Sequence, residues 1–203
     1  MKNETVIVIG GGESVKAMNV GEICKRGYSI GANGAAVHAP VDCGVSMDRQ
    51  WAEYYHDQIV GKPFYLRKAK EKWDKLVSFS CEHESNVFSE TEGKLNGRNS
   101  GYCAFNLAYQ MNPKTIYLFG FDMGGGYWFK RYPWEDPKRG SSDKKHKQEA
   151  NIARIYDIWV VGFDMARKLC DKKGIKVYVV GKSKIKSFPN ITYERFLELE
   201  CKK

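Results

Sequence analysis

The sequence lacks any apolar run that approaches the roughly 20 residues of a transmembrane helix, so it predicts no membrane span. It also lacks the C-x-x-C and paired-histidine spacings of zinc sites, although it contains six cysteines. Several cysteines lie in apolar runs, which favours a reducing compartment such as the cytoplasm. The polar first residues, MKNE, precede a short apolar run that is typical of a buried strand rather than of a signal peptide.

The chain also contains no internal repeat and no low-complexity segment. Hydrophobic residues make up 42% of it and charged residues 28%, which is ordinary for a globular protein and enough to fill a core. Domains typically contain roughly 100–200 residues, and this chain has 203. We therefore expect a single domain over residues 1–203.

The charge balance is basic. The chain has 33 Lys and Arg against 24 Asp and Glu, a formal net charge of +9. This excess favours anionic partners such as nucleic acid, nucleotides or phosphorylated sugars. Much of it lies in two lysine-rich segments, 138–147 and 182–186, and such runs are usually solvated surface, so charge alone does not choose among these partners.

Apolar runs that resemble strands alternate with helical patterns along the chain. The three strongest runs, Thr5–Ile9, Thr115–Phe119 and Ile175–Val180, predict central parallel strands. The alternation predicts an α/β fold with a doubly wound, Rossmann-like and mostly parallel sheet that has helices on both faces. Weaker strands are predicted over residues 28–32, 42–47, 63–66 and 77–81, and helices over residues 15–27, from 48, and over 102–111, 150–170 and 192–200.

Two segments show no periodicity. Residues 82–98 are polar and rich in turn formers, which predicts a long loop. Residues 124–146 contain glycines, aromatic residues and many charges, which predicts a mobile loop that closes over a site.

A glycine-rich turn, Gly10-Gly11-Gly12-Glu13-Ser14, follows the first strand. Glycines let the backbone approach a ligand, and the N-terminus of the next helix favours phosphate through its free N–H groups and positive dipole end. Ser14 adds a hydroxyl. The turn departs from the G-x-G-x-x-G dinucleotide motif, because Val15 occupies the place of the last glycine. The alternative is a turn that only packs the helix on the sheet.

Polar residues also stand after other predicted strands, at the edge where open α/β sheets bind ligands. Asn33 has an amide that can bind a base or a sugar, although an Asn-Gly turn explains it equally well. Asp48 is either a ligand contact or a helix N-cap. Asp122 is a candidate for a ribose hydroxyl or a metal. Ser100 and Gly101 open a helix whose N-terminus offers N–H and hydroxyl donors.

Three segments carry a resemblance to a known family: VIVIGGGESV, GANG, and NSGYCAFNLAYQMNPKTIYLFGFDMGGGYWF at residues 99–129. They resemble the sialyltransferases of glycosyltransferase family 42, together with related phage-encoded proteins of the DUF115 and "norphogenetic protein" types. The resemblance covers about half of the chain, and residues 99–122 are its most specific part.

The resemblance implies a site for a nucleotide sugar, with CMP as the carrier. It implies that Gly11, Gly12 and Ser14 line the phosphate or the ribose, and that Asn33 contacts the nucleotide. Ser100 and Gly101 would hold the donor from the other side, with Gly120 and Asp122 against the base and the ribose. With Asp48 added from its position, the predicted nucleotide-binding residues are Gly11, Gly12, Ser14, Asn33, Asp48, Ser100, Gly101, Gly120 and Asp122.

The resemblance also implies two catalytic residues. Tyr127 would support the departing phosphate, and His146 would be the general base that takes the proton of the acceptor hydroxyl. No metal or other cofactor is needed if Tyr127 and backbone N–H groups stabilise the leaving phosphate. His146 lies among lysines, however, so it is alternatively a surface histidine.

We therefore expect a metal-independent, nucleotide-sugar-dependent glycosyltransferase located in the cytoplasm, or in the host cytoplasm if the chain is phage-encoded. Its acceptor would be a glycan or a nucleic acid, and the sequence leaves open whether it forms a homo-oligomer. Three alternatives remain. The chain could be a non-catalytic nucleotide-binding phage protein, a nucleic-acid-binding module that stacks bases on Trp128, Phe129 and Trp134, or a pterin pyrophosphokinase with ATP and a divalent metal at Asp48 and Asp122.

Overall fold

The computed structural model describes residues 4–70, 72–81, 87–124, 126–129, 132 and 142–201, and the side chains of 142–155 are not among the described parts. Eight strands form one sheet in which every neighbouring pair is parallel, which confirms the predicted fold class. The strands are β1 (Thr5–Ile9), β2 (Tyr28–Ala32), β3 (Cys43–Ser46), β4 (Phe64–Arg67), β5 (Leu76–Phe79), β6 (Thr115–Phe119), β7 (Lys176–Val180) and β8 (Asn190–Ile191).

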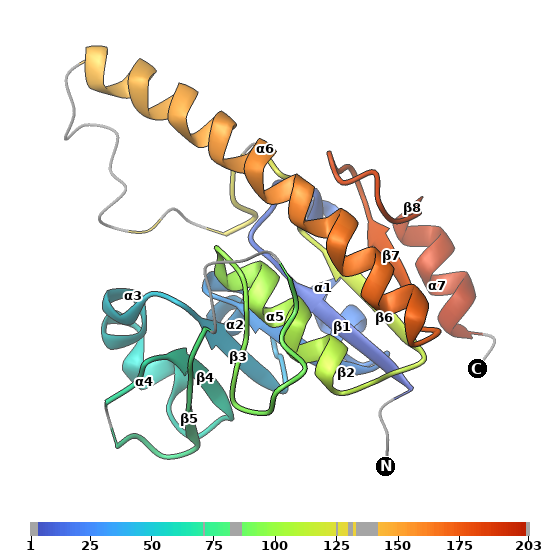
Figure 1. Cartoon of the computed structure of the whole chain (residues 1–203), viewed down its shortest axis with the longest axis horizontal. Coiled ribbons are helices and arrows are strands. Elements are labelled where there is room, and N and C mark those ends of the chain that lie inside the picture. Colours follow the sequence, from blue (N-terminus) through green and yellow to red (C-terminus); the bar gives the residue numbers. More distant parts are fainter. Residues whose placement is uncertain are drawn as a thin grey trace.

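The order of the strands across the sheet is β5-β4-β3-β2-β1-β6-β7-β8. The chain therefore builds outward from β1 in one direction, and then returns to place β6 on the other side of β1 (Figure 1). Every residue of β1 and β6 is buried. In β1, Val6 and Val8 face one hydrophobic core and Ile7 and Ile9 the other, as expected for a strand that is covered on both faces.

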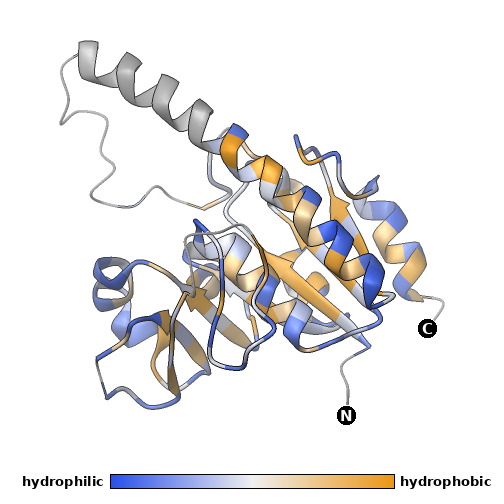
Figure 2. Cartoon of the chain, in the orientation of Figure 1, coloured by the Kyte–Doolittle hydropathy of each residue, from blue (hydrophilic) through white to orange (hydrophobic). Residues whose placement is uncertain are grey.

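Helices cover both faces of this sheet. One core contains residues of α5 (Ser100–Gln110) and α6 (Ser142–Lys172), which cross the front of the sheet in Figure 1. In Figure 2 the strands behind them are the most hydrophobic part of the view. The elements of the other face are the 3-10 helix η1 (Glu13–Ala17) and the helices α1 (Val20–Cys24), α2 (Gly34–His38), α3 (Arg49–Tyr54), α4 (His56–Ile59) and α7 (Tyr193–Cys201).

The structure corrects the predicted helix after the glycine turn. That segment is divided into the short η1 and α1, because Met18 is extended and the side chain of Asn19 accepts a hydrogen bond from the N–H of Glu22, which starts a new helix. The expected α-helical N-terminus beside the glycine turn is therefore only one 3-10 segment.

The structure also shortens the loop that was expected over residues 124–146. Helix α6 begins at Ser142, so residues 142–146 belong to the helix. Its first eight residues, SDKKHKQE, contain no apolar side chain, so hydrophobic periodicity could not detect this end of the helix. Helix α2 and strand β8 were likewise not predicted. No helix in the described part of the chain is both long and apolar enough to cross a bilayer.

The described part of the predicted loop 82–98 is fixed to helix α5 by polar side chains. The fully buried Asn106 accepts hydrogen bonds from the N–H groups of Ser89 (2.9 Å) and Asn96 (2.8 Å), and donates one to the carbonyl of Ser89 (2.9 Å). Gln110 donates to the same carbonyl of Ser89 and to those of Thr91 and Lys94. Asn106 therefore satisfies backbone groups of Ser89 and Asn96 that lie beside α5, and the loop leads directly into the N-terminus of this helix.

We predict that Asn106→Ala destabilises the protein by about 2–4 kcal/mol, since it leaves two N–H groups without a partner and each buried unpaired group costs about 1–3 kcal/mol. Urea unfolding measures this. The matched control is Gln110→Ala, whose partly exposed carbonyl partners water can reach, and it should cost about 1 kcal/mol or less. Equal losses for the two variants would contradict the structural role of Asn106.

Candidate functional site

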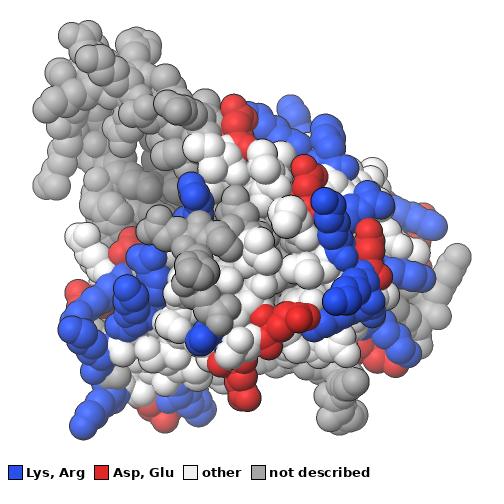
Figure 3. Space-filling view, viewed as in Figure 1, with Lys and Arg blue, Asp and Glu red and all other residues white. Residues whose placement is uncertain are grey.

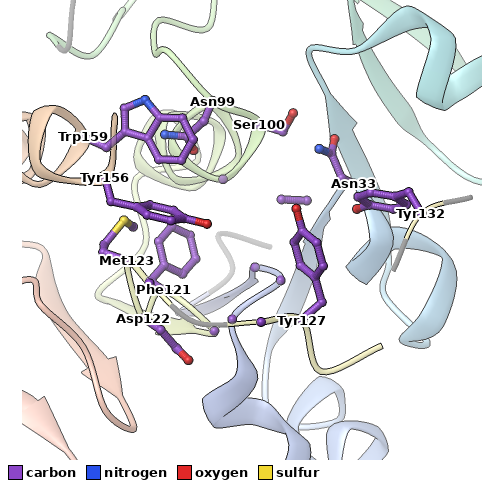
Figure 4. Close-up of a pocket in the computed structure, with 18 residues that line it drawn as sticks. Asn33, Asn99, Ser100, Phe121, Asp122, Met123, Tyr127, Tyr132, Tyr156 and Trp159 are labelled. Carbon is purple, nitrogen blue, oxygen red and sulfur yellow. The ribbon is translucent and has the colours of Figure 1, made fainter. Parts of the chain in front are cut away.

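A cavity of about 180 Å³ lies at the C-terminal edge of the sheet, where the strand order reverses between β1 and β6. This is the edge where ligands of open α/β sheets bind. Its wall combines the turns after β1, β2 and β6, the N-terminus of α5, the segment around Tyr127, and two aromatic residues of α6 (Figure 4). The cavity therefore brings Gly11, Gly12, Asn33, Ser100, Gly101, Gly120, Asp122 and Tyr127 together.

The three glycines of the first turn are packed against the end of β6. The N–H of Gly10 donates to the carbonyl of Phe119 (2.7 Å), and that of Gly12 to the carbonyl of Gly120 (2.9 Å). A Cβ atom at Gly10 would lie 2.7 Å from the carbonyl oxygen of Gly120, and one at Gly12 would lie 2.5 Å from the carboxyl carbon of Asp122. These glycines are thus required for packing, and two of their N–H groups are already bonded.

Ser14 and Asp122 bond to each other. The carboxylate of Asp122 accepts hydrogen bonds from the N–H of Ser14 (2.8 Å) and from its hydroxyl (2.5 Å). In Figure 4 the Asp122 side chain points away from the middle of the cavity. Burial raises the pKa of Asp122, and the Ser14 hydrogen bonds oppose that effect. The backbone of Asp122 lines the cavity, while its carboxylate joins the turns after β1 and β6. Contacts of these side chains with phosphate or ribose remain predictions.

Asn33 stands out by its backbone and by its side chain. Its φ of 47° and ψ of −120° belong to a region that favours glycine, and a residue held there costs about 1–3 kcal/mol. Its N–H donates to the carbonyl of Val45 (3.0 Å), which fixes the turn on β3. The side-chain oxygen is buried in the cavity wall and has no hydrogen-bond partner among the described residues. A buried acceptor of this kind needs a donor, which a ligand can supply.

The N-terminus of α5 forms the side of the cavity beside Asn33. Asn99 caps the helix, accepting a hydrogen bond from the N–H of Tyr102 (2.8 Å), and the hydroxyl of Ser100 accepts one from the N–H of Met47 (2.9 Å). The N–H groups of Ser100 and Gly101 have no acceptor in the described parts of the chain. This end of an 11-residue helix therefore presents free donors and a positive dipole end to the cavity.

The aromatic segment after β6 packs on the glycine turn. Trp128 donates from its indole N–H to the carbonyl of Gly10 (2.9 Å), and the ring of Tyr127 stacks on Phe129 with centroids 5.2 Å apart. The hydroxyl of Tyr132 accepts a hydrogen bond from the N–H of Gly34 (3.0 Å). Figure 4 shows the Tyr127 hydroxyl directed into the middle of the cavity. Tyr127 is thus placed to donate a hydrogen bond to a ligand there.

Two residues of α6 that sequence reasoning did not select also reach the cavity. Tyr156 directs its hydroxyl inward, and Trp159 packs edge-on against it, with ring centroids 5.2 Å apart (Figure 4). Their spacing carries the signal, because they continue the stripe of Phe163, Ala166 and Cys170 at intervals of three and four residues. Fifteen helical residues extend about 22 Å, whereas a five-residue strand extends about 17 Å. The stripe is therefore longer than the sheet and overhangs its C-terminal edge.

The remaining predicted residues lie elsewhere. Asp48 caps α3, accepting a hydrogen bond from the N–H of Trp51 (3.1 Å), and it lines a neighbouring cavity rather than the one with Asp122. The side chain of His146 lies outside the described residues, although the residue falls in α6. Within the described ranges, no group of three or more His, Cys, Asp and Glu side chains is placed to hold a metal ion.

Neither a scan against protein-family models nor a search of curated proteins found a match for this chain. The geometry of the cavity is therefore the basis for any assignment of its function.

We predict that Asp122→Asn keeps the stability of the protein at pH 7, because an amide can still accept from the Ser14 N–H and bond to its hydroxyl. Asp122→Ala should cost about 1–3 kcal/mol, since it leaves the Ser14 donors without a partner. Urea unfolding compares the two variants. A larger loss for the Asn variant than for the Ala variant would contradict this role.

The raised pKa of Asp122 makes the stability of the protein depend on pH. A carboxyl whose folded-state pKa exceeds its unfolded-state value binds its proton more tightly in the folded protein, so its contribution to stability increases as the pH falls through the folded-state pKa. The wild type should therefore gain stability relative to Asp122→Asn when the pH is lowered from 7 toward the folded-state pKa. Urea unfolding at several pH values measures the difference, and a relative loss for the wild type would refute it.

Proposed function

We propose that the cavity binds a nucleotide and that the chain is a nucleotide-sugar-dependent glycosyltransferase. The observation that carries the proposal is the buried Asn33 side-chain oxygen, which lacks a partner among the described residues and lies in the same cavity wall as the N-terminus of α5. An amide acceptor suits the amino group of a base or a ribose hydroxyl, and a helix N-terminus suits phosphate. A nucleotide carries both kinds of group at a short separation.

The size of the cavity supports a ligand that extends beyond it. Its volume of about 180 Å³ is smaller than the roughly 300–1,000 Å³ of most ligand pockets. It shares Asn33, Asn99, Ser100 and Trp159 with the neighbouring cavity of about 710 Å³. The nucleotide would occupy the smaller space, with its transferred group toward the larger one.

The chemistry of transfer would follow from these donors. When the bond between the sugar and the phosphate breaks, negative charge develops on the departing phosphate. The N–H groups of Ser100 and Gly101 and the Tyr127 hydroxyl would stabilise that charge without a metal, because fixed dipoles cost no reorganisation during the reaction. The resemblance to family 42 supplies CMP as the first carrier to test and His146 as the base that takes the acceptor proton.

The first test is a thermal-shift titration of the protein with CMP, UDP, GDP and ADP, because a ligand that binds only the folded state raises the melting temperature. We expect one nucleotide to produce a clear shift. Asn33→Gly should fold at least as well as the wild type, since glycine accepts a positive φ without strain, and should weaken binding of that nucleotide by about tenfold or more through loss of one hydrogen bond to the ligand. The absence of any nucleotide shift, or unchanged affinity in Asn33→Gly, would overturn the proposal.

The second test follows release of the nucleotide from its sugar conjugate, first with water and then with an alcohol as the acceptor. Tyr127→Phe should lower kcat by about 10²–10³-fold with a small change in KM, the loss typical of one removed donor to a developing anion. His146→Ala should abolish transfer to an alcohol acceptor and leave nucleotide affinity intact. Tyr193→Phe, on α7, is the matched control and should keep full activity. If Tyr127→Phe retained wild-type kcat, the leaving-group role would be wrong.

A further inference from the structure

The larger of the two cavities has a strongly basic wall. Its charged lining residues are Arg49, Arg67, Lys68, Lys70 and Arg98, against the single acid Asp48. The carboxylate of Asp48 caps α3, and Arg49 pairs with Glu53 at 2.8 Å on the exposed face of that helix. Among the described residues that line this cavity, positively charged side chains therefore outnumber acidic ones by five to one. Figure 3 shows Lys and Arg side chains gathered over the edge of the sheet that carries α3, β4 and β5.

Three separate segments bring these charges to one place. Arg67 is the last residue of β4 and Lys68 follows it, Arg49 opens α3 after β3, and Arg98 immediately precedes the cap of α5. Lys68 has a positive φ of 51°, which an L residue adopts at a cost. Its N–H donates to the carbonyl of Phe79 (2.8 Å), so the turn that carries it is tied to β5. The backbones that carry Arg49, Arg67, Lys68 and Arg98 thus lie at or beside the ends of strands and helices.

The field of this wall acts on a neighbouring side chain. The pKa of the Cys81 thiol is lowered, first by its hydrogen bond with Cys103 and then by the charges of Arg67 and Lys68. Burial opposes this effect, and the hydrogen bond with Cys103 is the largest cause of the lowered pKa.

We propose that this basic cavity binds the phosphate groups of the second substrate, the acceptor to which the sugar is transferred. The inference rests on the proposed function, because it identifies the substrate that faces the nucleotide. The two cavities share Asn99 and Ser100, so an acceptor in the basic cavity meets the donor at the N-terminus of α5. A wall lined by lysine and arginine side chains favours an anion with several oxygens, and guanidinium groups match the oxygens of phosphate in pairs.

Phosphate of this kind can come from a phosphorylated sugar or from the phosphodiester backbone of a single strand of nucleic acid. The experiment uses one probe for each source: glucose 6-phosphate, measured by calorimetry, and a fluorescently labelled hexathymidylate, measured by anisotropy. The test variant combines Lys68→Asn with Arg98→Gln. Asparagine tolerates the positive φ at position 68, so this change removes charge without new backbone strain.

The matched control combines Lys182→Gln with Lys186→Gln, which removes the same charge from exposed positions outside both cavities. We expect one probe to bind the wild type, the test variant to weaken that binding at least tenfold, and the control to weaken it threefold or less. If the bound probe is the hexathymidylate, the slope of log affinity against log salt should also fall by about 1.4 in the test variant, since each lost contact with a single strand contributes about 0.7.

Nucleotide binding by the same variants separates the two proposals. The test variant should keep the nucleotide affinity of the wild type within threefold, because its changed residues line only the basic cavity. If neither probe binds, or if the test and control variants lose the same affinity, the basic cavity is not a phosphate site and the inference is overturned while nucleotide binding stands. If a probe binds as expected but no nucleotide does, the phosphate site is supported and the transferase assignment fails.

Discussion

The close approach of the first glycine turn to the end of β6 is the constraint on which the rest of this edge depends. With side chains at Gly10 or Gly12, the carbonyl of Gly120 and the carboxylate of Asp122 would have to move away. Because the turn lies flat on β6, Ser14 reaches Asp122 and the indole of Trp128 reaches the carbonyl of Gly10. The turn therefore forms a closed wall of the cavity, and the groups available to a ligand come from α5, Asn33 and α6.

Because of this arrangement, the helix N-terminus with free N–H groups at the cavity is that of α5 and not that of the segment after the glycine turn. In dinucleotide-binding folds the turn after the first strand leads into a long helix whose N-terminus receives phosphate. Here the turn leads into the short η1, whose first N–H groups include the Ser14 donor already bound by Asp122. Helix α5 is longer and has Ser100 and Gly101 donors with no acceptor in the described residues. The free positive end of a helix dipole thus lies across the cavity from the glycines.

The sequence was sufficient for the parts of the fold that depend on local burial. The bounds of β1, β2 and β6 match the prediction. β1 and β6 are five-residue apolar runs rich in β-branched and aromatic residues, which favours buried strands at that length. The capping role of Asp48 was one of two readings of the sequence, and the structure favours it. The pairing of Ser14 with Asp122 joins residues 108 positions apart, and no local pattern contains it. The role of Asn106 could not be predicted either, since its partners are backbone groups of a loop that has no hydrophobic periodicity.

Asn33 shows how the edge of the sheet combines strain with an unsatisfied group. Glycine would fit its backbone without strain, and Gly34 already follows it, so the turn itself does not require an asparagine. The side chain instead places a buried oxygen in the cavity wall without a partner in the described part of the chain. Both features cost stability in the free protein. A ligand donor would satisfy the Asn33 oxygen, although the backbone strain would stay. Part of the stability lost at this residue would therefore be regained on binding.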